Sequence, residues 1–278
     1  MKKRRIPRPF LKWVGGKTQL LPALIEMIPK STGVYHEPFV GGGALFFELA
    51  PKRAVLSDLN QELIDCYQAV RDSVGEVVEI LKTHRYEKEH FYQVRAVDPW
   101  QLSLTERAAR MIYLNRAGFN GLYRVNSKGQ FNVPFGRYTN PTICDEPNLR
   151  GCSQRLQGVA LRCEPFEAVL TRAKRGDLVY FDPPYIPVSD TAYFTAYEKS
   201  GFGMDSQERL SEVFDELAER GVFVILSNAD VPWMRSQYEE HYLRPIMASR
   251  NVNSKADKRG PVGELIVTGF KPPRYLLL

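Results

Sequence analysis

The chain has 278 residues, of which 44% are hydrophobic and 25% are charged, a composition typical of a soluble globular protein. This length predicts one large domain, or one domain that carries an insertion. No apolar run approaches the roughly 20 residues that cross a bilayer, and no long apolar segment follows the basic start, so we expect neither a membrane span nor a signal peptide. The four cysteines form no C-x-x-C pair and lie near no histidine at zinc spacing. We therefore expect a cytoplasmic protein with free thiols and no metal site; the cysteines are Cys66, Cys144, Cys152 and Cys163.

The positive charge is concentrated in one part of the chain. The net charge is +6 and the pI is about 9.1, which suits a polyanionic partner such as nucleic acid. Residues 107–140 contain six basic side chains and no Asp or Glu, and aromatic side chains lie between them. A solvated surface normally mixes both signs, whereas cations with aromatics and asparagines are typical of a surface that meets phosphates and bases. The basic residues are Arg107, Arg110, Arg116, Arg124, Lys128 and Arg137, and the aromatic residues are Tyr113, Phe119, Tyr123, Phe131, Phe135 and Tyr138.

The first third of the chain alternates between helical and strand patterns. Such an alternation predicts right-handed parallel β-α-β units. In chain order, we expect a helix over 17–28, a strand over 33–39, a helix over 41–50 that opens on glycines, a strand from 53 that ends on Asp58, and an amphipathic helix over 61–73.

The next stretch, 74–150, has a different pattern. Three helical segments are followed by "LYRVNSKGQFNVPF", which predicts a β-hairpin with Ser-Lys-Gly near its turn, and then by a link rich in Pro and Asn. Because no parallel-sheet strand is evident here, we interpret this stretch as an inserted domain. The predicted division is a first part at 1–73, an inserted domain at 74–150 and a second part at 151–278; the helices are expected at 74–84, 88–97 and 105–117.

The alternating pattern resumes at about residue 159. A strand-forming run ends at Asp182, and the stretch 186–202, with no clear period, is expected to be a loop that moves. A well-marked amphipathic helix follows, with Asp205 as its expected N-cap and Gly221 as its stop. A buried strand is expected over 222–228, and 243–250 with 263–270 predicts a closing antiparallel pair joined by a basic loop.

The glycine stretch "EPFVGGGALFFEL" follows a strand and opens a helix, where ligands of parallel sheets bind. A dinucleotide fingerprint from Gly41 would place its last glycine at Phe46, so a nicotinamide cofactor is disfavoured. A ligand turn and a ligand-free tight turn both remain open. Asp58 favours the ligand, because an acidic residue about 20 positions on, at the end of the second strand, is where a ribose is bound. Asp58 could also cap the helix that begins near Asn60, and the two roles are compatible.

The stretch "WVGGKT" at 13–18 is similar to the end of a phosphate-binding loop. The full pattern needs a glycine five residues before Gly16, and that position is Leu11, so an ATPase is excluded. Lys17 could still bind a carboxylate. The alternative is a solvated lysine on the first turn of a helix, which the surrounding Trp13 and glycines disfavour.

The stretch "LVYFDPPYIP" ends an apolar strand on a carboxylate, two prolines and a tyrosine. Prolines have no N–H to donate, so the Asp182 carboxylate and the Pro183 carbonyl form a rigid pair of acceptors. Tyr185 would stand beside them as a flat stacking surface. Two acceptors and a ring suit a planar amino group, such as the exocyclic amine of a base; the alternative is a structural cap.

Together these motifs resemble a known family. "EPFVGGG", "SDLN" and "FDPPY" are similar to the cofactor-binding, ribose-binding and catalytic motifs of S-adenosylmethionine-dependent DNA adenine-N6 methyltransferases, and "PFLKWVGGK" at the start gives the motif order of their alpha group. "YLNRAGFNGLYRVNSKGQFNVPFGRY" is similar to the recognition region of the Dam type, which methylates adenine in GATC. The resemblance covers nearly the whole chain and implies a Rossmann-like methyltransferase sheet with an inserted, mostly helical DNA-recognition domain that carries a β-hairpin.

The resemblance also implies roles for the positions that match. Asp182, Pro183, Pro184 and Tyr185 would form the catalytic segment. The cofactor would be held by Trp13, Lys17, Phe39, Gly41, Gly43, Asp58, Phe166 and Asp182, with Lys17 at its carboxylate, Asp58 at its ribose and Phe166 against its adenine. Contacts with DNA would come from Lys12, Phe119, Asn120, Leu122, Arg124, Pro134, Arg137 and Tyr138.

Within that DNA-binding set, Arg124 corresponds to a guanine reader, and a bidentate arginine is the commonest specific contact with guanine. Leu122 and Pro134 would touch a thymine methyl group, while Lys12 and Tyr138 would approach the first guanine. Phe119 and Asn120 match the pair that inserts beside the space left by a flipped adenine. The family usually has Tyr where this chain has Phe119, so stacking is kept and any hydroxyl contact with a phosphate is lost.

Two alternatives stay open at this point. Related acceptor-Pro-Pro-aromatic motifs also serve methyltransferases that act on RNA or on a protein glutamine, although the long basic insertion favours duplex DNA. The chain could also be a DNA-binding module without catalysis, which the intact segment from Asp182 to Tyr185 disfavours. With double-stranded DNA as the partner, no metal and no membrane contact are expected, and the protein is expected to be a monomer.

Overall fold

The computed structural model describes residues 6–13, 19–186, 202–249 and 261–273. The chain divides into two compact units. Unit 1 comprises residues 1–18, 40–50 and 57–164, and unit 2 comprises residues 19–39, 51–56 and 165–278. The predicted boundaries of an inserted domain at 74 and 150 stay a prediction.

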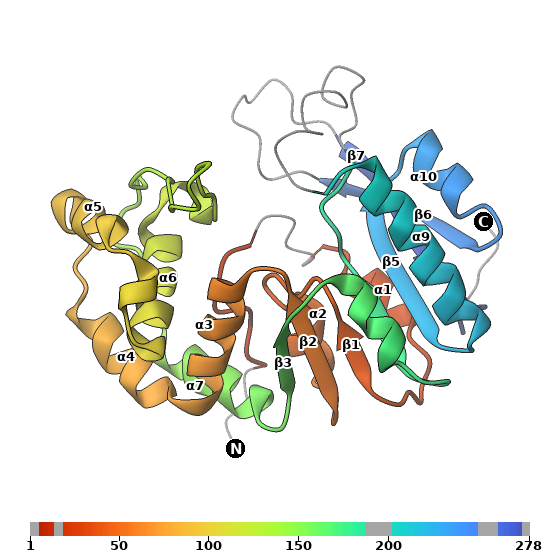
Figure 1. Cartoon of the computed structure of the whole chain (residues 1–278), viewed down its shortest axis with the longest axis horizontal. Coiled ribbons are helices and arrows are strands. Elements are labelled where there is room, and N and C mark those ends of the chain that lie inside the picture. The colour runs from red at the N-terminus through yellow and green to blue at the C-terminus, as the bar shows by residue number, and fades with distance from the viewer. Residues whose placement is uncertain (1–5, 14–18, 187–201, 250–260, 274–278) are drawn as a thin grey trace. The chain divides into compact units, whose positions relative to one another are not determined.

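Seven strands form one mixed sheet in the order β3-β2-β1-β4-β5-β7-β6 (Figure 1). The pairs β1/β2, β1/β4 and β4/β5 are parallel, whereas β5/β7 and β6/β7 are antiparallel. This arrangement confirms the α/β prediction and the closing antiparallel pair. The strands are β1 (Tyr35–Glu37), β2 (Ala54–Asp58), β3 (Ala160–Cys163), β4 (Leu178–Phe181), β5 (Phe223–Ala229), β6 (Tyr242–Ser249) and β7 (Pro261–Thr268).

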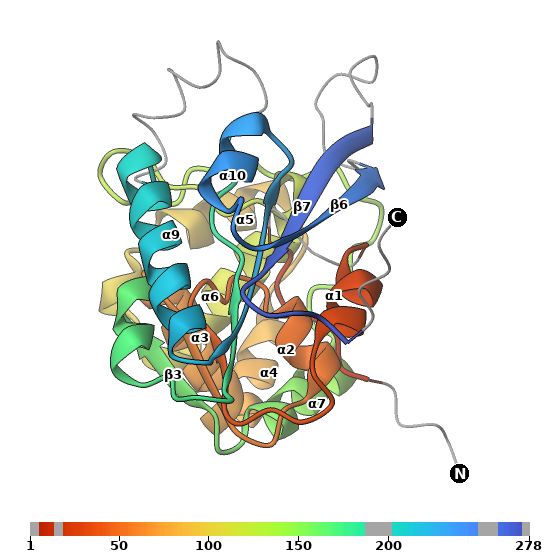
Figure 2. The same ribbon diagram turned by 90° about the vertical axis from the view of Figure 1, so that its right-hand side faces the viewer.

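Unit 2 is built around the apolar strands β4 and β5, whose residues are almost all buried. Strands that read as continuous apolar runs are typical of parallel sheets covered on both faces. The amphipathic helix α9 (Met204–Glu219) lies alongside β5 and buries Leu210, Phe214 and Leu217 (Figure 1). Figure 2 shows β6 and β7 as a twisted ribbon. The other helices of this unit are α1 (Leu21–Met27), the 3-10 helix η3 (Phe166–Thr171) and α10 (Pro232–Gln237).

Unit 1 is mostly helical among its described residues. Helix α6 (Leu104–Ala117) is buried along most of its length and packs against α3 (Gln61–Asp72), α4 (Val74–Thr83) and α5 (Lys88–Ala96). Ser103 and Glu106 form a capping box that fixes where α6 begins, since each satisfies a backbone N–H of the other. The remaining elements are α2 (Ala44–Leu49), the 3-10 helices η1 (Pro99–Gln101) and η2 (Phe119–Gly121), and α7 (Glu146–Leu156).

Two predicted helix caps are wrong. Asn60, not Asp58, caps α3, because its side chain accepts from the N–H of Leu63 while Asp58 accepts from the N–H of Asn60. Gly203 occupies the N-cap of α9, so Asp205 lies inside the first turn, where its negative charge still suits the helix dipole. The stop at Gly221 is confirmed by its φ of +77°, which favours glycine.

The sequence reading also missed two short helices. Helix α7 begins within the stretch interpreted as a link, and its start carries an Asp145 cap and a proline in the first turn. Helix α10 follows β5, again with a proline in its first turn. Both were hard to predict because few apolar residues mark their buried faces.

The predicted hairpin turns back at Asn126–Gly129, where the N–H of Gly129 donates to the carbonyl of Asn126. Its two sides pair through an isolated bridge between Val125 and Phe131, and no extended strand forms within 122–135. The N-terminal basic run, Lys17, most of the predicted loop at 186–202 and the basic loop at 250–260 lie outside the described residues.

Among the helices that the structure describes, none has both the length and the apolar character needed to cross a membrane. Over the same residues, no group of three or more His, Cys, Asp or Glu side chains is arranged to hold a metal ion.

Candidate active site and nucleic-acid interface

The glycine turn of unit 1 depends on the absence of side chains. Gly41 and Gly43 have φ values of +43° and +65°, in the left-handed region that favours glycine. A Cβ atom on Gly41 would lie 2.6 Å from Cδ1 of Trp13, and one on Gly43 would lie 2.8 Å from the hydroxyl oxygen of Tyr67. That hydroxyl donates to the carbonyl of Gly41 over 3.1 Å. The turn is therefore a tightly built backbone surface with Trp13 packed against it.

Asp58, at the end of β2, is tied to this turn. One carboxylate oxygen accepts from the N–H of Gly41 at 3.2 Å and the other from the N–H of Asn60 at 3.0 Å. Burial raises the pKa of Asp58, and the backbone N–H groups of Asn60, Gly41 and Leu59 oppose that rise. Each oxygen still has a lone pair for a further donor, such as a ribose hydroxyl.

In unit 2, Asp182 follows directly after β4. Its Oδ1 accepts from the hydroxyl of Ser227 on β5 at 3.1 Å, and that hydroxyl also contacts the Tyr180 hydroxyl at 2.9 Å. Ser227 is fully buried. Because a buried hydroxyl with partners on both sides has little freedom to rotate, it fixes one edge of the Asp182 carboxylate.

The two prolines and Tyr185 are held by side chains from other elements. The Gln207 amide of α9 donates to the carbonyl of Pro184 at 2.9 Å, and the Tyr185 hydroxyl donates to Glu264 of β7 at 3.1 Å. In the part of the chain that the structure describes, the carbonyl of Pro183 accepts no hydrogen bond. Burial, and then the charges of Asp182 and Glu264, raise the pKa of Tyr185 well above its ordinary value. Tyr185 is therefore a neutral, anchored ring.

Two aromatic side chains predicted to hold a cofactor, Phe39 and Phe166, lie close together in unit 2. The rings of Phe39 and Phe166 are stacked, with centroids 5.4 Å apart, and Phe202 meets both rings at steep angles. Phe166 is only 6% exposed, so the face that a ligand could cover is limited by its two neighbours.

In unit 1, the structure brings together several residues predicted to contact DNA. The Lys12 ammonium lies 4.5 Å from the centre of the Tyr138 ring, and Tyr138 donates from its hydroxyl to the carbonyl of Gly118. Asn115, which the sequence reading did not single out, joins this group: its amide bonds to the backbone of Lys12 and to the carbonyl of Gly121. Lys12, Phe119, Asn120, Pro134 and Tyr138 thus belong to one connected surface region, with Phe119 43% exposed and Asn120 at a φ of +54°.

This region borders a pocket of about 390 Å³ lined in part by Arg8, Lys12, Arg116 and Asp145. Burial, and then the Arg116 charge, lower the pKa of Lys12. Three cationic side chains beside one carboxylate make this pocket suitable for an anionic group such as a phosphate.

Arg124, the predicted guanine reader, is exposed and held by Asn132. Its Nε donates to the side-chain oxygen of Asn132 at 2.7 Å, and one terminal nitrogen donates to the Asn132 carbonyl at 3.3 Å. The outer edge of the guanidinium keeps N–H groups for a base. Leu122 is partly buried and Arg137 is exposed.

The side chains that position Asp182 to Tyr185 were not found from the sequence. Ser227, Asn228, Gln207 and Glu264 come from elements distant in the chain. One signal was present: "SN" ends the apolar strand β5 with two polar residues that the structure buries completely. Buried polar side chains at the carboxyl end of a parallel strand indicate a site.

The mixed sheet, with a glycine turn and two carboxylates at the ends of its parallel strands, defines an α/β protein whose polar side chains gather where such folds bind ligands. A family model for D12 class N6 adenine-specific DNA methyltransferases matches residues 13–255. Because the match covers most of the chain, this protein belongs to that family.

Named relatives agree with this assignment. The chain is 45% identical over 271 residues to a type II methyltransferase, M1.LlaDCHI, of Lactococcus lactis subsp. cremoris, covering 95% of both chains. It is 40% identical to the type II methyltransferase M.MjaIII of Methanocaldococcus jannaschii, covering 95% of this chain and 99% of that one. It is 37% identical to the DNA adenine methylase of Escherichia coli strain K12, covering 95% and 96%. The protein is therefore an enzyme that methylates adenine in DNA.

Proposed function

We propose that this enzyme transfers a methyl group from S-adenosylmethionine to N6 of a flipped-out adenine in double-stranded DNA, within GATC, and that it acts as a monomer in the cytoplasm. The observation that carries this proposal is the pair of acceptors at the end of β4. Asp182 is fixed on one edge by Ser227, and the carbonyl of Pro183 accepts no hydrogen bond within the described chain. The name DNA adenine methylase among the relatives supports the target.

The residues present fit the cofactor. Asp58 keeps acceptor capacity for ribose hydroxyls, and it is hydrogen-bonded to a glycine turn that Trp13 and Tyr67 pack against so closely that neither Gly41 nor Gly43 could carry a Cβ atom. In this proposal Trp13, Lys17, Gly41, Gly43 and Asp58 hold one part of the cofactor, while Phe39, Phe166 and Asp182 contact another. When bound, S-adenosylmethionine supplies an electrophilic methyl group on its sulfonium sulfur.

The acceptors act on the adenine amino group. A stacked adenine cannot present this group, so the base leaves the duplex and its ring lies on Tyr185. Asp182 and the Pro183 carbonyl then accept its two N–H groups. Acceptors in this position favour the pyramidal, positive nitrogen of the transition state over the flat amine, whose lone pair is delocalised into the ring. Holding the amino group in line with the methyl group supplies most of the rate enhancement. The proton leaves N6 after the methyl group has been transferred.

Target reading is assigned to unit 1. Arg124 would donate to a guanine edge from the side of its guanidinium that Asn132 does not occupy. Lys12 and Tyr138 would approach the first guanine, Leu122 and Pro134 a thymine methyl group, and Arg137 the surrounding backbone. Phe119 and Asn120, both exposed, would fill the space left by the adenine.

The target is tested with tritiated S-adenosylmethionine and three duplexes: GATC, GATC already methylated at N6, and a duplex with one base pair of GATC replaced. We expect incorporation into the first duplex alone. Equal incorporation into the replaced duplex would contradict GATC, and incorporation into RNA or protein instead would favour the alternative amino-methyltransferases.

Asp182→Ala tests the chemistry. It removes one of the two acceptors, so methyl transfer should fall by at least ~10³-fold, in the range of a lost transition-state donor or acceptor, while binding of GATC duplex and the thermal midpoint stay near wild type. Near-normal turnover in this variant would contradict the mechanism.

A further inference from the structure

Tyr123 connects two parts of unit 1, the glycine turn with Trp13 packed on it and the segment from Arg124 onward that is proposed to read DNA. Its ring is stacked on the indole of Trp13, with centroids 5.4 Å apart and planes at 22°, and it meets Phe131 edge-on at 5.9 Å. The next residue, Arg124, is the proposed guanine reader. One side chain thus touches the proposed cofactor side of unit 1 and is joined covalently to the residue that would read the target.

The contacts around Tyr123 close into a ring. Trp13 packs on Gly41, Gly41 donates to Asp58, and Asp58 accepts from the N–H of Asn60. The side chain of Asn60 caps α3, and Glu62 in the first turn of that helix accepts from the Tyr123 hydroxyl. Three members of this ring, Trp13, Gly41 and Asp58, are among the residues of unit 1 to which cofactor binding is assigned. A ligand that restrains them also restrains Tyr123.

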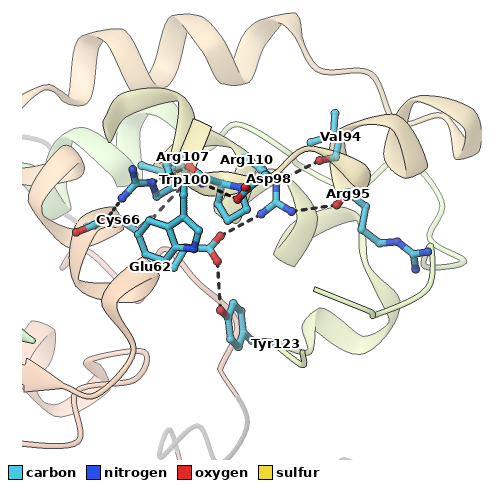
Figure 3. A network of polar contacts seen from close by, with 12 residues as sticks. Glu62, Cys66, Val94, Arg95, Asp98, Trp100, Arg107, Arg110 and Tyr123 are labelled. Carbon is cyan, nitrogen blue, oxygen red and sulfur yellow. Dashed lines mark hydrogen bonds and ion pairs between the residues drawn. The ribbon is translucent and has the colours of Figure 1, made fainter. Parts of the chain in front are cut away.

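A buried ion pair fixes the tyrosine hydroxyl (Figure 3). The hydroxyl donates to Glu62 at 3.2 Å, and the other carboxylate oxygen of Glu62 accepts from Arg110 at 3.1 Å. The remaining N–H groups of Arg110 donate to the carbonyls of Val94 and Arg95. Burial raises the pKa of Glu62, and Arg110 and Tyr123 oppose that rise. Because a buried ion pair adds little net stability, its best-attested use is to fix a register, and here it fixes where Tyr123 sits.

We propose that Tyr123 is a positioning residue that couples the cofactor to target recognition, so that each ligand strengthens the binding of the other. This inference rests on the proposed function, since it takes Trp13, Gly41 and Asp58 as cofactor ligands and Arg124 as the base reader. A cofactor packed on the ring of contacts orders Tyr123, and the backbone of Arg124 then loses less freedom when DNA binds. By linkage, DNA must favour the cofactor by the same factor.

The test measures, on the full chain, the factor by which bound DNA tightens the binding of a cofactor ligand. The dissociation constant of S-adenosylhomocysteine, the product of methyl transfer, is measured by calorimetry without DNA and with saturating GATC duplex. We expect DNA to tighten binding by ~5-fold or more in the wild type. Tyr123→Leu removes the stack and the hydroxyl, and Tyr123→Phe removes the hydroxyl alone; a reduction of the factor to below ~2-fold in either variant supports the proposal. If Tyr123→Leu does not fold, Tyr123→Phe decides.

The matched control is Tyr92→Leu on α5. Tyr92 contacts Phe91 and Arg95, and it shares no ring contact with Trp13, so this variant should keep the wild-type factor. A wild-type factor near 1, or a factor unchanged in both Tyr123 variants, would overturn the coupling. Failure of the wild type to methylate GATC would show up separately in the tritium assay and would remove the proposed function itself.

Discussion

Ser227 shows how a single hydroxyl can prepare a carboxylate. It is fully buried, and it donates to Asp182 while holding a contact to the Tyr180 hydroxyl. In the proposed mechanism, a carboxylate that is already fixed on one edge lowers the cost of meeting the adenine amino group. The residues Asp182 to Tyr185 could be predicted from their own spacing. Ser227 could not, because only the pairing of β4 with β5 brings it to Asp182.

Ser227→Ala should therefore reduce kcat while leaving the KM for DNA nearly unchanged. A hydrogen bond to a charged group contributes about 1.5–3 kcal/mol, so we expect a loss of ~10- to 100-fold. Tyr180→Phe should cost less, since Ser227 still donates to Asp182. Steady-state kinetics on GATC duplex measures both variants, and a kcat within twofold of wild type for Ser227→Ala would show that Asp182 needs no such support.

Among the helices and strands, the success of the sequence prediction depends on how clear the apolar pattern of each element is. The helices α3, α6 and α9 were predicted because apolar residues recur at a helical period, and the strands β2, β4 and β5 because each contains a short apolar run. The caps were predicted less well: Asp58 and Asn60 are both good capping residues two positions apart, and only the course of the backbone decides between them. The hairpin at 122–135 was marked by its turn, yet one isolated bridge and a few backbone and side-chain hydrogen bonds hold it instead of a regular ladder.

The end of α4 contains a pH-sensitive contact. Nδ1 of His84 lies 2.9 Å from Nε2 of His90, and the His84 ring is stacked on Tyr113 at 4.4 Å. Burial, and then His90, lower the pKa of His84 from 6.5 to about 4. Below about pH 6.5, His84 is protonated in the unfolded chain but stays neutral in the folded chain. The free energy of unfolding therefore falls as the pH drops from 6.5 to about 4.

The variant His84→Phe keeps a stacking ring and removes the titration. Allowing for partial solvent screening, we expect the wild type to lose ~1–2 kcal/mol more than the variant between about pH 7 and pH 4. Urea unfolding at several pH values measures this difference. Parallel curves for the two proteins would show that His84 does not contribute to acid sensitivity.

For the whole molecule, motif order and charge distribution identified the family and the substrate before any contact was known. The motifs allowed a prediction of which residues act, because backbone conformation and chemistry restrict a glycine turn or an Asp-Pro-Pro-Tyr segment to few residue types. The supporting side chains escaped prediction, because Tyr123 and Glu62 contact each other, and Asn115 contacts Lys12, only when the fold joins distant parts of the chain. We propose that the positive charge of the chain serves both a specific base reader, Arg124, and non-specific phosphate contacts.

These two kinds of positive charge should respond differently to salt. Each phosphate contact contributes about 0.9 to the slope of log affinity against log salt, whereas a base contact contributes to discrimination. Replacing Lys2, Lys3, Arg4 and Arg5 together by Ala should flatten the slope by up to ~3–4 and weaken GATC and altered duplexes alike. Arg124→Ala should instead reduce discrimination at one base pair by ~1–3 kcal/mol. Fluorescence anisotropy between about 50 and 200 mM salt measures both quantities. An unchanged slope would mean that the N-terminal charges are only solvated, and uniform weakening by Arg124→Ala would make Arg124 a phosphate contact.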